Sequence, residues 1–436
     1  MSRIAFLTHE PFYPPSGGGS AEALYLVEEM VARGHEVHLF CPKLADAQLV
    51  REKFKVQLHE FTLWKMGRYA ALRNFKYLAF PFFLQQLVES VAREVKFDLV
   101  FSQHAIAAVT AGRLKRSLGV PVVMNFLDYL TAFMETWPAY VAPRPAVNAL
   151  KRFEVNLPKK YDADGVLTVS DTLADYFRAT GYPVERIKPI FFGFDSALFP
   201  FRGGTATDEQ SGPSPQPNGF PSPPPVSSPK STFANAKSGP RGEGGKKDSK
   251  QPVVVMHGSL DQHHLQKIAV EAVAVVSREM PEVTFRFVGH RTRTLENFLS
   301  RVEVAAPNAK IETTGFVPYT EVVKHLSSAT VGMVPYEEST GTHCAFVAKI
   351  VEYLAVGLPA VSTPLNSAVR YFKNEPTVRF AQFNGASFGA KLLEALRAPY
   401  DAEAARRASE RVQRELDWRT ISRNAVDFAE KAMRSK

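Results

Sequence analysis

The sequence of 436 residues is poor in cysteine, which occurs only at Cys41 and Cys344. Two cysteines far apart give neither a disulfide framework nor a metal-type Cys/His spacing, and they fit a reducing compartment. The sequence also lacks any apolar run near the roughly 20 residues that a membrane span needs, and residues 1–8 are too short an apolar run for a signal peptide. An aspartate-rich metal motif is absent too. We therefore expect a cytoplasmic protein, soluble or peripheral on the inner face of the membrane, without a metal or other cofactor.

The composition that is present is typical of a globular protein with an excess of positive charge. Hydrophobic residues make up 45% and charged residues 22% of the sequence, and the formal net charge is +9. The length favours two domains over a single core. The positive charge favours anionic partners such as nucleotides, anionic lipids or polyanions.

Residues 3–41 predict the opening of a doubly wound α/β domain, because a strand, a glycine loop, a helix and a second strand follow one another. Gly17, Gly18 and Gly19 form the loop before the helix. Their backbone amides can hold a phosphate or a sugar hydroxyl. Since the run is not G-x-G-x-x-G, a flexible turn is an equally good interpretation.

Polar residues follow two further apolar runs, at 97–104 and 119–128. Ligands of open α/β sheets bind beyond the carboxyl ends of strands, so His104, Asn125 and Asp128 lie where chemistry can occur. Loop capping is the alternative for each of them, and for His104 alone capping is the more common role.

Residues 61–86 contain four Lys or Arg residues, many aromatic residues and no acidic residue. This composition is typical of a helix on an anionic membrane surface or of an anion-binding acceptor site. The alternative is that the aromatic residues belong to the core and the cations form a solvated face. We expect Pro81 to end the helix in this segment.

Residues 203–251 are rich in Pro, Gly, Ser and Lys and almost free of aliphatic residues, which predicts a disordered insertion. The insertion separates a first domain, residues 1–200, from a second domain, residues 252–415. A last helix at 416–436 is expected to pack back on the first domain.

Residues 349–363 predict a helix that ends at Gly357 and runs into a short buried strand. Lys349 and Glu352 lie near the N-terminus of this helix, where a cation and a carboxylate suit a phosphate attached to a ribose. An ion pair on a surface helix is the commoner arrangement for such a spacing. The position of the helix, after a buried strand of a second α/β half, favours nucleotide binding.

These parts resemble, in their order, the GT-B glycosyltransferases and, within them, the retaining, nucleotide-sugar-dependent group 1 family, also called family 4. The most specific segment is 349–363, with its K-x-x-E-Y-L-A-x-G-x-P pattern. Weaker matches occur at residues 14–19, 32–37, 164–170, 192–195 with Phe199, 315–316 and 329–335. The resemblance covers nearly everything except the insertion. It implies two Rossmann-like domains that face each other across a cleft.

The resemblance also implies sugar transfer from a nucleotide-diphosphate donor to a hydroxyl acceptor, which is a glycan, a lipid or a small molecule. Glu352 would hold the ribose, and Lys349 would stabilise the leaving diphosphate. Asp128 and His104 would orient the acceptor or the sugar. The other donor-binding candidates are Gly17, Gly18, Gly19, Gly258, Ser259, His264, Ala345, Phe346 and Val347. The expected partners are a nucleotide sugar, a hydroxyl acceptor and an anionic membrane surface at 61–86, with no nucleic acid.

The sequence departs from the family pattern at three places. Many members have a sugar-contacting Glu at the position of Cys344, for which Glu337 or Glu338 is a possible substitute. The Arg and Lys that meet the diphosphate are replaced by Ser259 and His264, and the His of an H-D pair is Leu127. Three alternatives therefore stay open: a sugar-nucleotide epimerase, a phosphorylase, or a catalytically degenerate GT-B binding protein.

Overall fold

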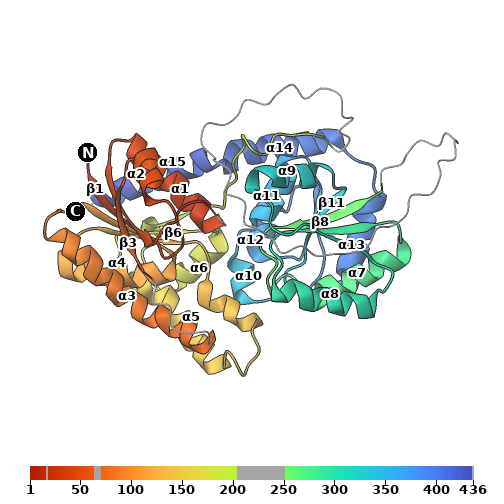
Figure 1. Ribbon diagram of the computed structural model, residues 1–436, viewed down its shortest axis with the longest axis horizontal. Coiled ribbons are helices and arrows are strands. Elements are labelled where there is room, and N and C mark those ends of the chain that lie inside the picture. The colour runs from red at the N-terminus through yellow and green to blue at the C-terminus, as the bar shows by residue number, and fades with distance from the viewer. Residues whose placement is uncertain (16–17, 63–69, 204–250, 435–436) are drawn as a thin grey trace.

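The computed structural model describes residues 1–15, 18–62, 70–203 and 251–434, with the backbone alone at 70–78. In these parts, two parallel sheets lie side by side, each covered by helices on both faces (Figure 1). The structure therefore confirms the GT-B arrangement of two Rossmann-like domains. The predicted insertion at 203–251 lies almost wholly outside the described residues, and Gly17 lies outside them too.

The first sheet has the strand order β3-β2-β1-β4-β5-β6-β7, and all its strands pair in parallel. The order reverses between β1 and β4, and ligands of doubly wound sheets bind at the carboxyl end of such a switch point. The strands are β1 (Arg3–Leu7), β2 (Glu36–Pro42), β3 (Gln57–Phe61), β4 (Leu99–Gln103), β5 (Val122–Phe126), β6 (Gly165–Thr168) and β7 (Ile187–Pro189).

Helices flank this sheet on both faces, and one of them differs from the expectation. The helix at 70–92 does not end at Pro81 but continues through it. Its packing on the next helix holds it there, and the Pro81 carbonyl accepts a hydrogen bond from Thr110 Oγ1 at 3.1 Å. The helices are α1 (Gly18–Ala32), α2 (Ala47–Phe54), α3 (Ala70–Ala92), α4 (His104–Leu118), η1 (Leu130–Thr136), α5 (Arg144–Tyr161), α6 (Asp171–Ala179) and η2 (Val184–Arg186).

The second sheet repeats this plan, with the order β10-β9-β8-β11-β12-β13 and a switch point between β8 and β11. Its central strands β8, β11 and β12 are short, fully buried runs, whereas the edge strand β10 is polar and mostly exposed. The strands are β8 (Val253–His257), β9 (Thr284–Val288), β10 (Lys310–Thr313), β11 (Val331–Val334), β12 (Ala360–Ser362) and β13 (Val378–Phe380).

The helices of the second domain place the 349–363 segment at the switch point. Helix α11 (Ala348–Ala355) follows β11 and ends before Gly357, whose φ of +84° lies in the left-handed region. The others are α7 (Lys267–Glu279), α8 (Arg293–Ala305), α9 (Tyr319–Ser327), α10 (Thr340–Cys344), α12 (Asn366–Phe372) and α13 (Gly385–Arg397).

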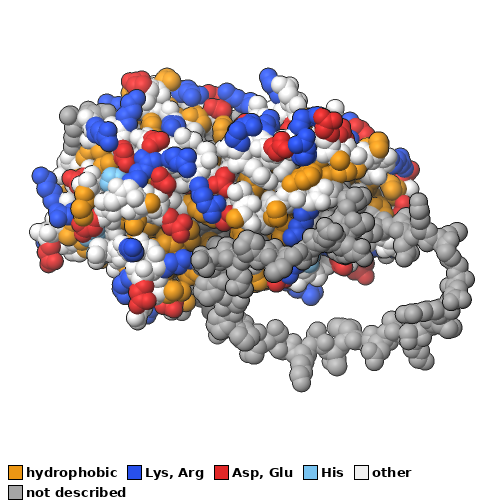
Figure 2. Space-filling view, turned by 90° about the horizontal axis from the view of Figure 1, so that it is seen from above, with side chains coloured by type: hydrophobic (Ala, Val, Ile, Leu, Met, Phe, Trp, Pro, Cys, Tyr) orange, Lys and Arg blue, Asp and Glu red, His pale blue; other side chains and the backbone are white. Residues whose placement is uncertain are grey.

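The last two helices lie one on each domain (Figure 1). Helix α14 (Ala402–Leu416) packs on α11, whereas α15 (Trp418–Arg434) packs on α1. Where the two meet, Phe194 exchanges backbone hydrogen bonds with Leu416 and Trp418, both 3.0 Å long. The face over these helices mixes Lys and Arg with Asp and Glu side chains (Figure 2). The net positive charge is therefore not concentrated on that face.

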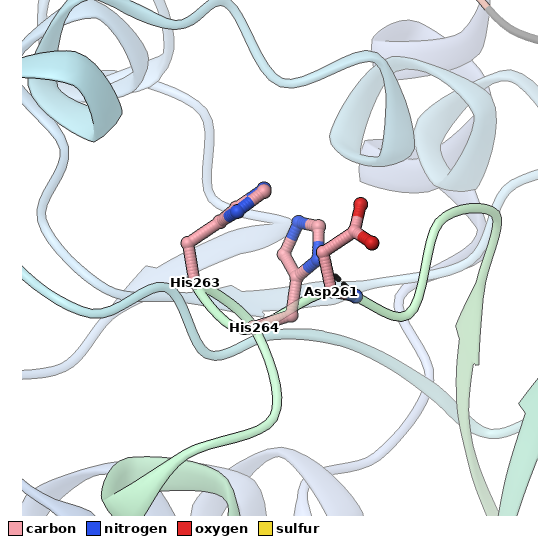
Figure 3. A group of neighbouring side chains, drawn as sticks. All are labelled: Asp261, His263 and His264. Carbon is pink, nitrogen blue, oxygen red and sulfur yellow. Dashed lines mark hydrogen bonds between the residues drawn. The ribbon is translucent and has the colours of Figure 1, made fainter. Parts of the chain in front are cut away.

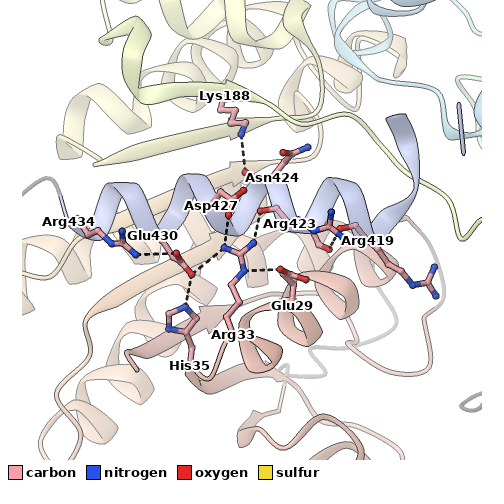
Figure 4. Close-up of polar contacts among 11 residues, drawn as sticks. Glu29, Arg33, His35, Lys188, Arg419, Arg423, Asn424, Asp427, Glu430 and Arg434 are labelled. Atoms are coloured by element: carbon pink, nitrogen blue, oxygen red, sulfur yellow. Dashed lines mark hydrogen bonds and ion pairs between the residues drawn. The ribbon is translucent and has the colours of Figure 1, made fainter. Parts of the chain in front are cut away.

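A polar network around Arg33 fastens α15 to the first domain (Figure 4). Arg33 lies just after α1, and its guanidinium contacts Glu29 (2.8 Å), Asp427 (2.6 Å) and Glu430 (3.3 Å). Its Nη2 also donates to the Arg423 carbonyl at 3.2 Å. The side chain is only 21% exposed, so these charge-assisted contacts are partly shielded from water.

Replacing Arg33 with Met should destabilise the chain by about 1–2 kcal/mol. Glu29 and Asp427 would lose their ion-pair partner, whereas Glu430 would keep its contact with His35. We expect a lower midpoint of thermal unfolding. The matched control is Arg423→Met, because Arg423 takes part in the network through its backbone carbonyl. Equal midpoints for the two variants would contradict the role given to the Arg33 side chain.

Candidate active site

Glu352 lies buried on α11, in the second domain, with both carboxylate oxygens in hydrogen bonds. Tyr319 Oη donates to Oε1 at 2.6 Å, and Oε2 is bonded to His257 Nε2. Burial and the neighbouring Glu352 raise the pKa of Tyr319 well above its ordinary value, so this hydroxyl stays protonated and donates. A carboxylate has about four acceptor positions, so two remain for ligand hydroxyls.

Lys349 lies one turn earlier on α11 and does not form the surface ion pair that its spacing with Glu352 suggests. Its side chain is buried, and Nζ lies 3.5 Å from His264 Nε2 and 5.7 Å from the centre of the Tyr336 ring. Burial lowers the pKa of Lys349 to about 8. Burial also lowers the pKa of His264 well below its ordinary value, so His264 is neutral and Lys349 carries the positive charge.

The turn after β8 faces Lys349. Gly258 has a φ of +90°, and a Cβ placed on it would contact Lys349 Nζ at 3.8 Å. Ser259 follows on the exposed side of the turn. The structure thus brings Gly258, His264 and Lys349 together at one place, with Glu352 one turn further along α11.

Asp261, His263 and His264 come from this turn and lie close enough to hold a metal ion, with potential ligand atoms within 4.8 Å of one another (Figure 3). The neighbouring cation argues against that use. Lys349 Nζ lies 3.5 Å from His264 Nε2, so a divalent ion would sit against an ammonium group. The two imidazoles instead pack on aromatic rings, His263 on Phe133 at 5.1 Å and His264 on Tyr336 at 4.3 Å.

The segment before α11, residues 345–347, contacts the first domain through Phe346. The Ala345 amide already donates to the Gly341 carbonyl at 3.0 Å, and the Phe346 ring packs against Phe191 of the first domain at 4.9 Å. Val347 stands at the N-cap without a capping side chain. As at any helix start, the first amides of α11 lack intrahelical acceptors and can receive an anion.

The first domain contributes its own polar cluster at the opposite switch point. His104 Nε2 lies 3.2 Å from Glu10 Oε1, and both face Gly19. Gly18 instead faces the ring of Phe192, 2.2 Å from where its Cβ would be, so packing alone requires glycine there. Asp128 follows β5 nearby, and burial raises its pKa to about 7 against the opposing charge of His104.

The comparisons with known proteins agree with this arrangement. Residues 17–193 match the model of a glycosyl transferase 4-like domain. Residues 251–398 match the model of the glycosyl transferases group 1. The chain is a group 1 glycosyltransferase. A comparison of the sequence with curated proteins finds no match.

Solved structures share the fold of this glycosyltransferase at low sequence identity. HepE of Anabaena, in complex with UDP and glucose, is 16% identical over 99% of this chain and 100% of its own, with a TM-score of 0.68. Sucrose-phosphate synthase of Thermosynechococcus elongatus is 12% identical over 100% of both chains, with a TM-score of 0.72. WaaG, a glycosyltransferase involved in lipopolysaccharide biosynthesis, is 14% identical over 98% of this chain and 99% of its own, with a TM-score of 0.63.

Membership in the family settles the reaction class of the glycosyltransferase: it transfers a sugar from a nucleotide donor. Both family models describe glycosyl transferases, so the epimerase and phosphorylase alternatives are not favoured. The degenerate binding protein is not favoured either, because both halves of the chain match models of glycosyl transferases.

The structure shows what surrounds Cys344, which stands where many family members have a glutamate, and its two possible substitutes, Glu337 and Glu338. Cys344 is buried, and its carbonyl accepts from Ser170 Oγ at 2.5 Å. Glu337 does not replace the missing carboxylate, because its Oε1 accepts from the Ile268 amide at the start of α7 (3.0 Å). Glu338 is exposed beside His343. Among the described residues, Asp128 is the carboxylate whose charge acts on both Cys344 and Tyr336.

The two domains touch through backbone at α10 and η1. A Cβ on Gly341 would lie 2.5 Å from the Phe133 amide nitrogen, and Thr340 N donates to Glu135 Oε2 at 2.7 Å. Lys151 Nζ binds Thr340 Oγ1 at 2.9 Å. These contacts fix the separation of the domains across the cleft.

Replacing Gly341 with Val should force α10 away from η1, because backbone rather than a mobile side chain blocks the new atoms. We expect kcat to fall about tenfold or more, since small misplacements of reacting groups are costly. The affinity for UDP, measured by calorimetry, should stay within about twofold, because its predicted site lies within the second domain. An unchanged kcat would contradict the importance of this contact.

Three site residues were not among those predicted from the sequence: Glu10, His257 and Tyr319. His257 ends β8 directly before Gly258, so the rule on the carboxyl ends of strands would have found it. Tyr319 opens α9 and is brought to Glu352 by the tertiary fold.

A cavity of about 510 Å³ opens between the domains. It is lined by residues such as Thr136, Gln262 and Arg301, and none of the predicted site residues lines it.

Proposed function

We propose that this glycosyltransferase binds a nucleotide-diphosphate sugar on its second domain and transfers the sugar, with retention of configuration, to a hydroxyl acceptor. The acceptor is a glycan, a lipid or a small molecule. One observation carries the proposal: Lys349 and Glu352 are both buried on the first turns of one helix at a sheet switch point. There a cation and a carboxylate serve the diphosphate and the ribose respectively.

The transfer breaks the bond between the anomeric carbon and the phosphate oxygen and forms a bond from that carbon to the acceptor oxygen. Negative charge grows on the leaving diphosphate, and the Lys349 ammonium and the first amides of α11 stabilise it. Neutral His264 donates or accepts a hydrogen bond in the same place. The leaving phosphate takes the acceptor proton, so no side-chain base is needed.

In this proposal the Asp128 carboxylate and the His104 imidazole, both on the first domain, orient the acceptor and the sugar. Gly258 and Ser259 lie beside the diphosphate, and Gly19 lets the first domain approach the donor. We propose transfer without a metal ion, supported by the cation already present beside His264.

A panel of nucleotide sugars tests the donor. We expect UDP-glucose, UDP or another nucleotide sugar to raise the midpoint of thermal unfolding, because a ligand that binds only the folded chain stabilises it. HepE complexes with UDP and UDP-glucose make these the first probes. The coupling constant of the anomeric proton in the product then reports retention. If no nucleotide at millimolar concentration shifts the midpoint, the proposed function is wrong.

We also propose that the protein works in the cytoplasm at an anionic membrane surface. Of the predicted segment 61–86, residues 63–69 lie outside the described ones, but its last part exposes Phe82 and Phe83. Helix α5 adds exposed Leu150 and Phe153, five Lys or Arg residues and one acidic residue, which is buried. Both helices pack on α4, so they share one side of the first domain. In the described parts of the chain, no helix is long and apolar enough to span a bilayer.

The protein should sediment with phosphatidylglycerol vesicles at low salt, should not sediment with phosphatidylcholine vesicles, and should be released as salt screens the attraction. The double variant Phe82→Ser/Phe153→Ser should bind more weakly, because two apolar side chains no longer enter the interface. Val304→Ser is the control, since Val304 is an exposed apolar residue on the second domain. Sedimentation that ignores lipid charge would contradict the proposal.

A further inference from the structure

The cavity of about 510 Å³ between the two domains takes its walls from both of them. Thr294, Asn297 and Arg301 form one wall, and their spacing of three and four residues puts them on a single face of α8. Thr136, at the end of η1, belongs to the wall that the first domain supplies. Sites for small ligands have volumes of roughly 300–1,000 Å³ and are common at domain interfaces, so this cavity has the size and the place of one.

The lining of the cavity is rich in uncharged groups that both donate and accept hydrogen bonds. Carboxamides come from Gln262 and Gln266, in the turn before α7, and from Asn297, and Thr294 adds a hydroxyl. None of these four side chains is hydrogen-bonded to any residue that the structure describes. All four are therefore available to a ligand.

Arg301 is the one charged residue among the described residues that line the cavity. Its guanidinium already donates to the carbonyl oxygens of Leu265 and Asn297, the latter at 3.3 Å. A divalent metal ion would lack carboxylate ligands here, and a diphosphate would meet a single cation that is already engaged. The lining groups instead match a neutral ligand.

Sugars are the neutral ligands that these groups fit best. Each sugar hydroxyl is both a donor and an acceptor, as carboxamides and protein hydroxyls are, so the two sets of groups can satisfy each other. An aromatic ring is also close in the chain, because Trp137, which is 37% exposed, lies between the lining residues Thr136 and Pro138. The apolar face of a sugar ring can pack against such an indole.

The cavity is a different place from the nucleotide site proposed on α11. Neither Lys349 nor Glu352 lines it, and His264 does not line it either. His263 lies in the chain between Gln262 and His264, and its ring packs on Phe133 of the first domain with 5.1 Å between the ring centres. Because the two places share no lining residue, a ligand can fill the cavity while a nucleotide occupies the other site.

We propose that this cavity is a second saccharide-binding site, in which a short stretch of a glycan is held between the domains. The site goes beyond the proposed function, because the sugar units bound there neither give nor receive the transferred sugar. Since both domains line the cavity, the bound glycan contacts both of them.

Saturation-transfer difference NMR on the full chain tests the site, with maltotriose, cellotriose and chitotriose as probes. We expect saturation to pass from the protein to at least one of them, and the signal should persist when saturating UDP is added. The double variant Gln266→Leu/Asn297→Leu should raise the Kd of that trisaccharide about tenfold or more, because two hydrogen-bonding groups are lost. The variant should fold, because leucine favours a helix more than asparagine does and the Gln266 side chain makes no capping hydrogen bond.

Asn308→Leu is the matched control, because Asn308 is an exposed carboxamide of the second domain outside the cavity. Its Kd for the trisaccharide should equal that of the wild type. The inference is overturned if no probe gives a signal with the wild-type chain, if the double variant binds as well as the wild type, if Asn308→Leu weakens binding equally, or if UDP abolishes the signal. A chain that binds the trisaccharide but no nucleotide would keep this site and refute the proposed function.

Discussion

Replacing Glu352 with Ala is expected to remove the thermal stabilisation that a nucleotide sugar gives the wild-type chain. The ribose would lose its carboxylate, and the buried His257 and the Tyr319 hydroxyl would lose their partner. Removing one member of a buried charged contact costs about 2–4 kcal/mol of binding free energy, which corresponds to roughly 30- to 1000-fold in Kd. Calorimetry with UDP measures this change directly.

Two further variants separate ligand contacts from damage to the fold. Glu352→Gln keeps the shape of the side chain and one acceptor oxygen. Its affinity for UDP is therefore expected to lie between those of the wild type and Glu352→Ala. Tyr319→Phe removes the hydroxyl that occupies Oε1 but leaves the carboxylate, so UDP affinity should stay the same or rise. A folded Glu352→Ala chain with wild-type affinity for UDP would place the nucleotide elsewhere.

Lys349→Met is expected to lower kcat by about 10²- to 10³-fold, because the developing charge of the diphosphate loses its cation. The wild-type rate should also depend on pH in a defined way. The pKa of Lys349 is lowered to about 8 by burial, so the ammonium is present below that pH and is lost as pH rises through it. We therefore expect kcat to fall on the alkaline side of about pH 8.

Lys349→Arg is the matched variant, because a guanidinium stays charged throughout this range. Its kcat should be lower than that of the wild type, since the fork-shaped group fits differently, but the alkaline fall should disappear. Full kcat in Lys349→Met, or an unchanged alkaline fall in Lys349→Arg, would show that Lys349 does not stabilise the leaving group.

Local patterns were sufficient to predict the helix that carries Lys349 and Glu352 and its place after a buried strand. Lys349 and Glu352 lie on a helix whose apolar periodicity, terminal glycine and following strand are all visible in sequence, and Gly258 follows an apolar run. The carboxyl ends of strands likewise pointed to His104 and Asp128. These features depend on residues close together in the chain.

The contacts between the domains were not predictable in this way. Thr340 and Glu135 are 205 residues apart, and α10 and η1 are too short to show a hydrophobic period. Glu10 lies in a loop, and its role depends on a histidine from another strand end. Pro81 misled the prediction because tertiary packing on α4 outweighs the local cost of proline within a helix.

Hydrogen–deuterium exchange of the wild-type chain, with and without saturating UDP, tests the central claim most directly. The account predicts slower exchange in two segments, 258–264 and 346–352, because the diphosphate accepts from amides there and the ribose covers Glu352. Protection confined to the first domain, or absent from both segments while UDP is bound, would contradict a donor site at Lys349 and Glu352.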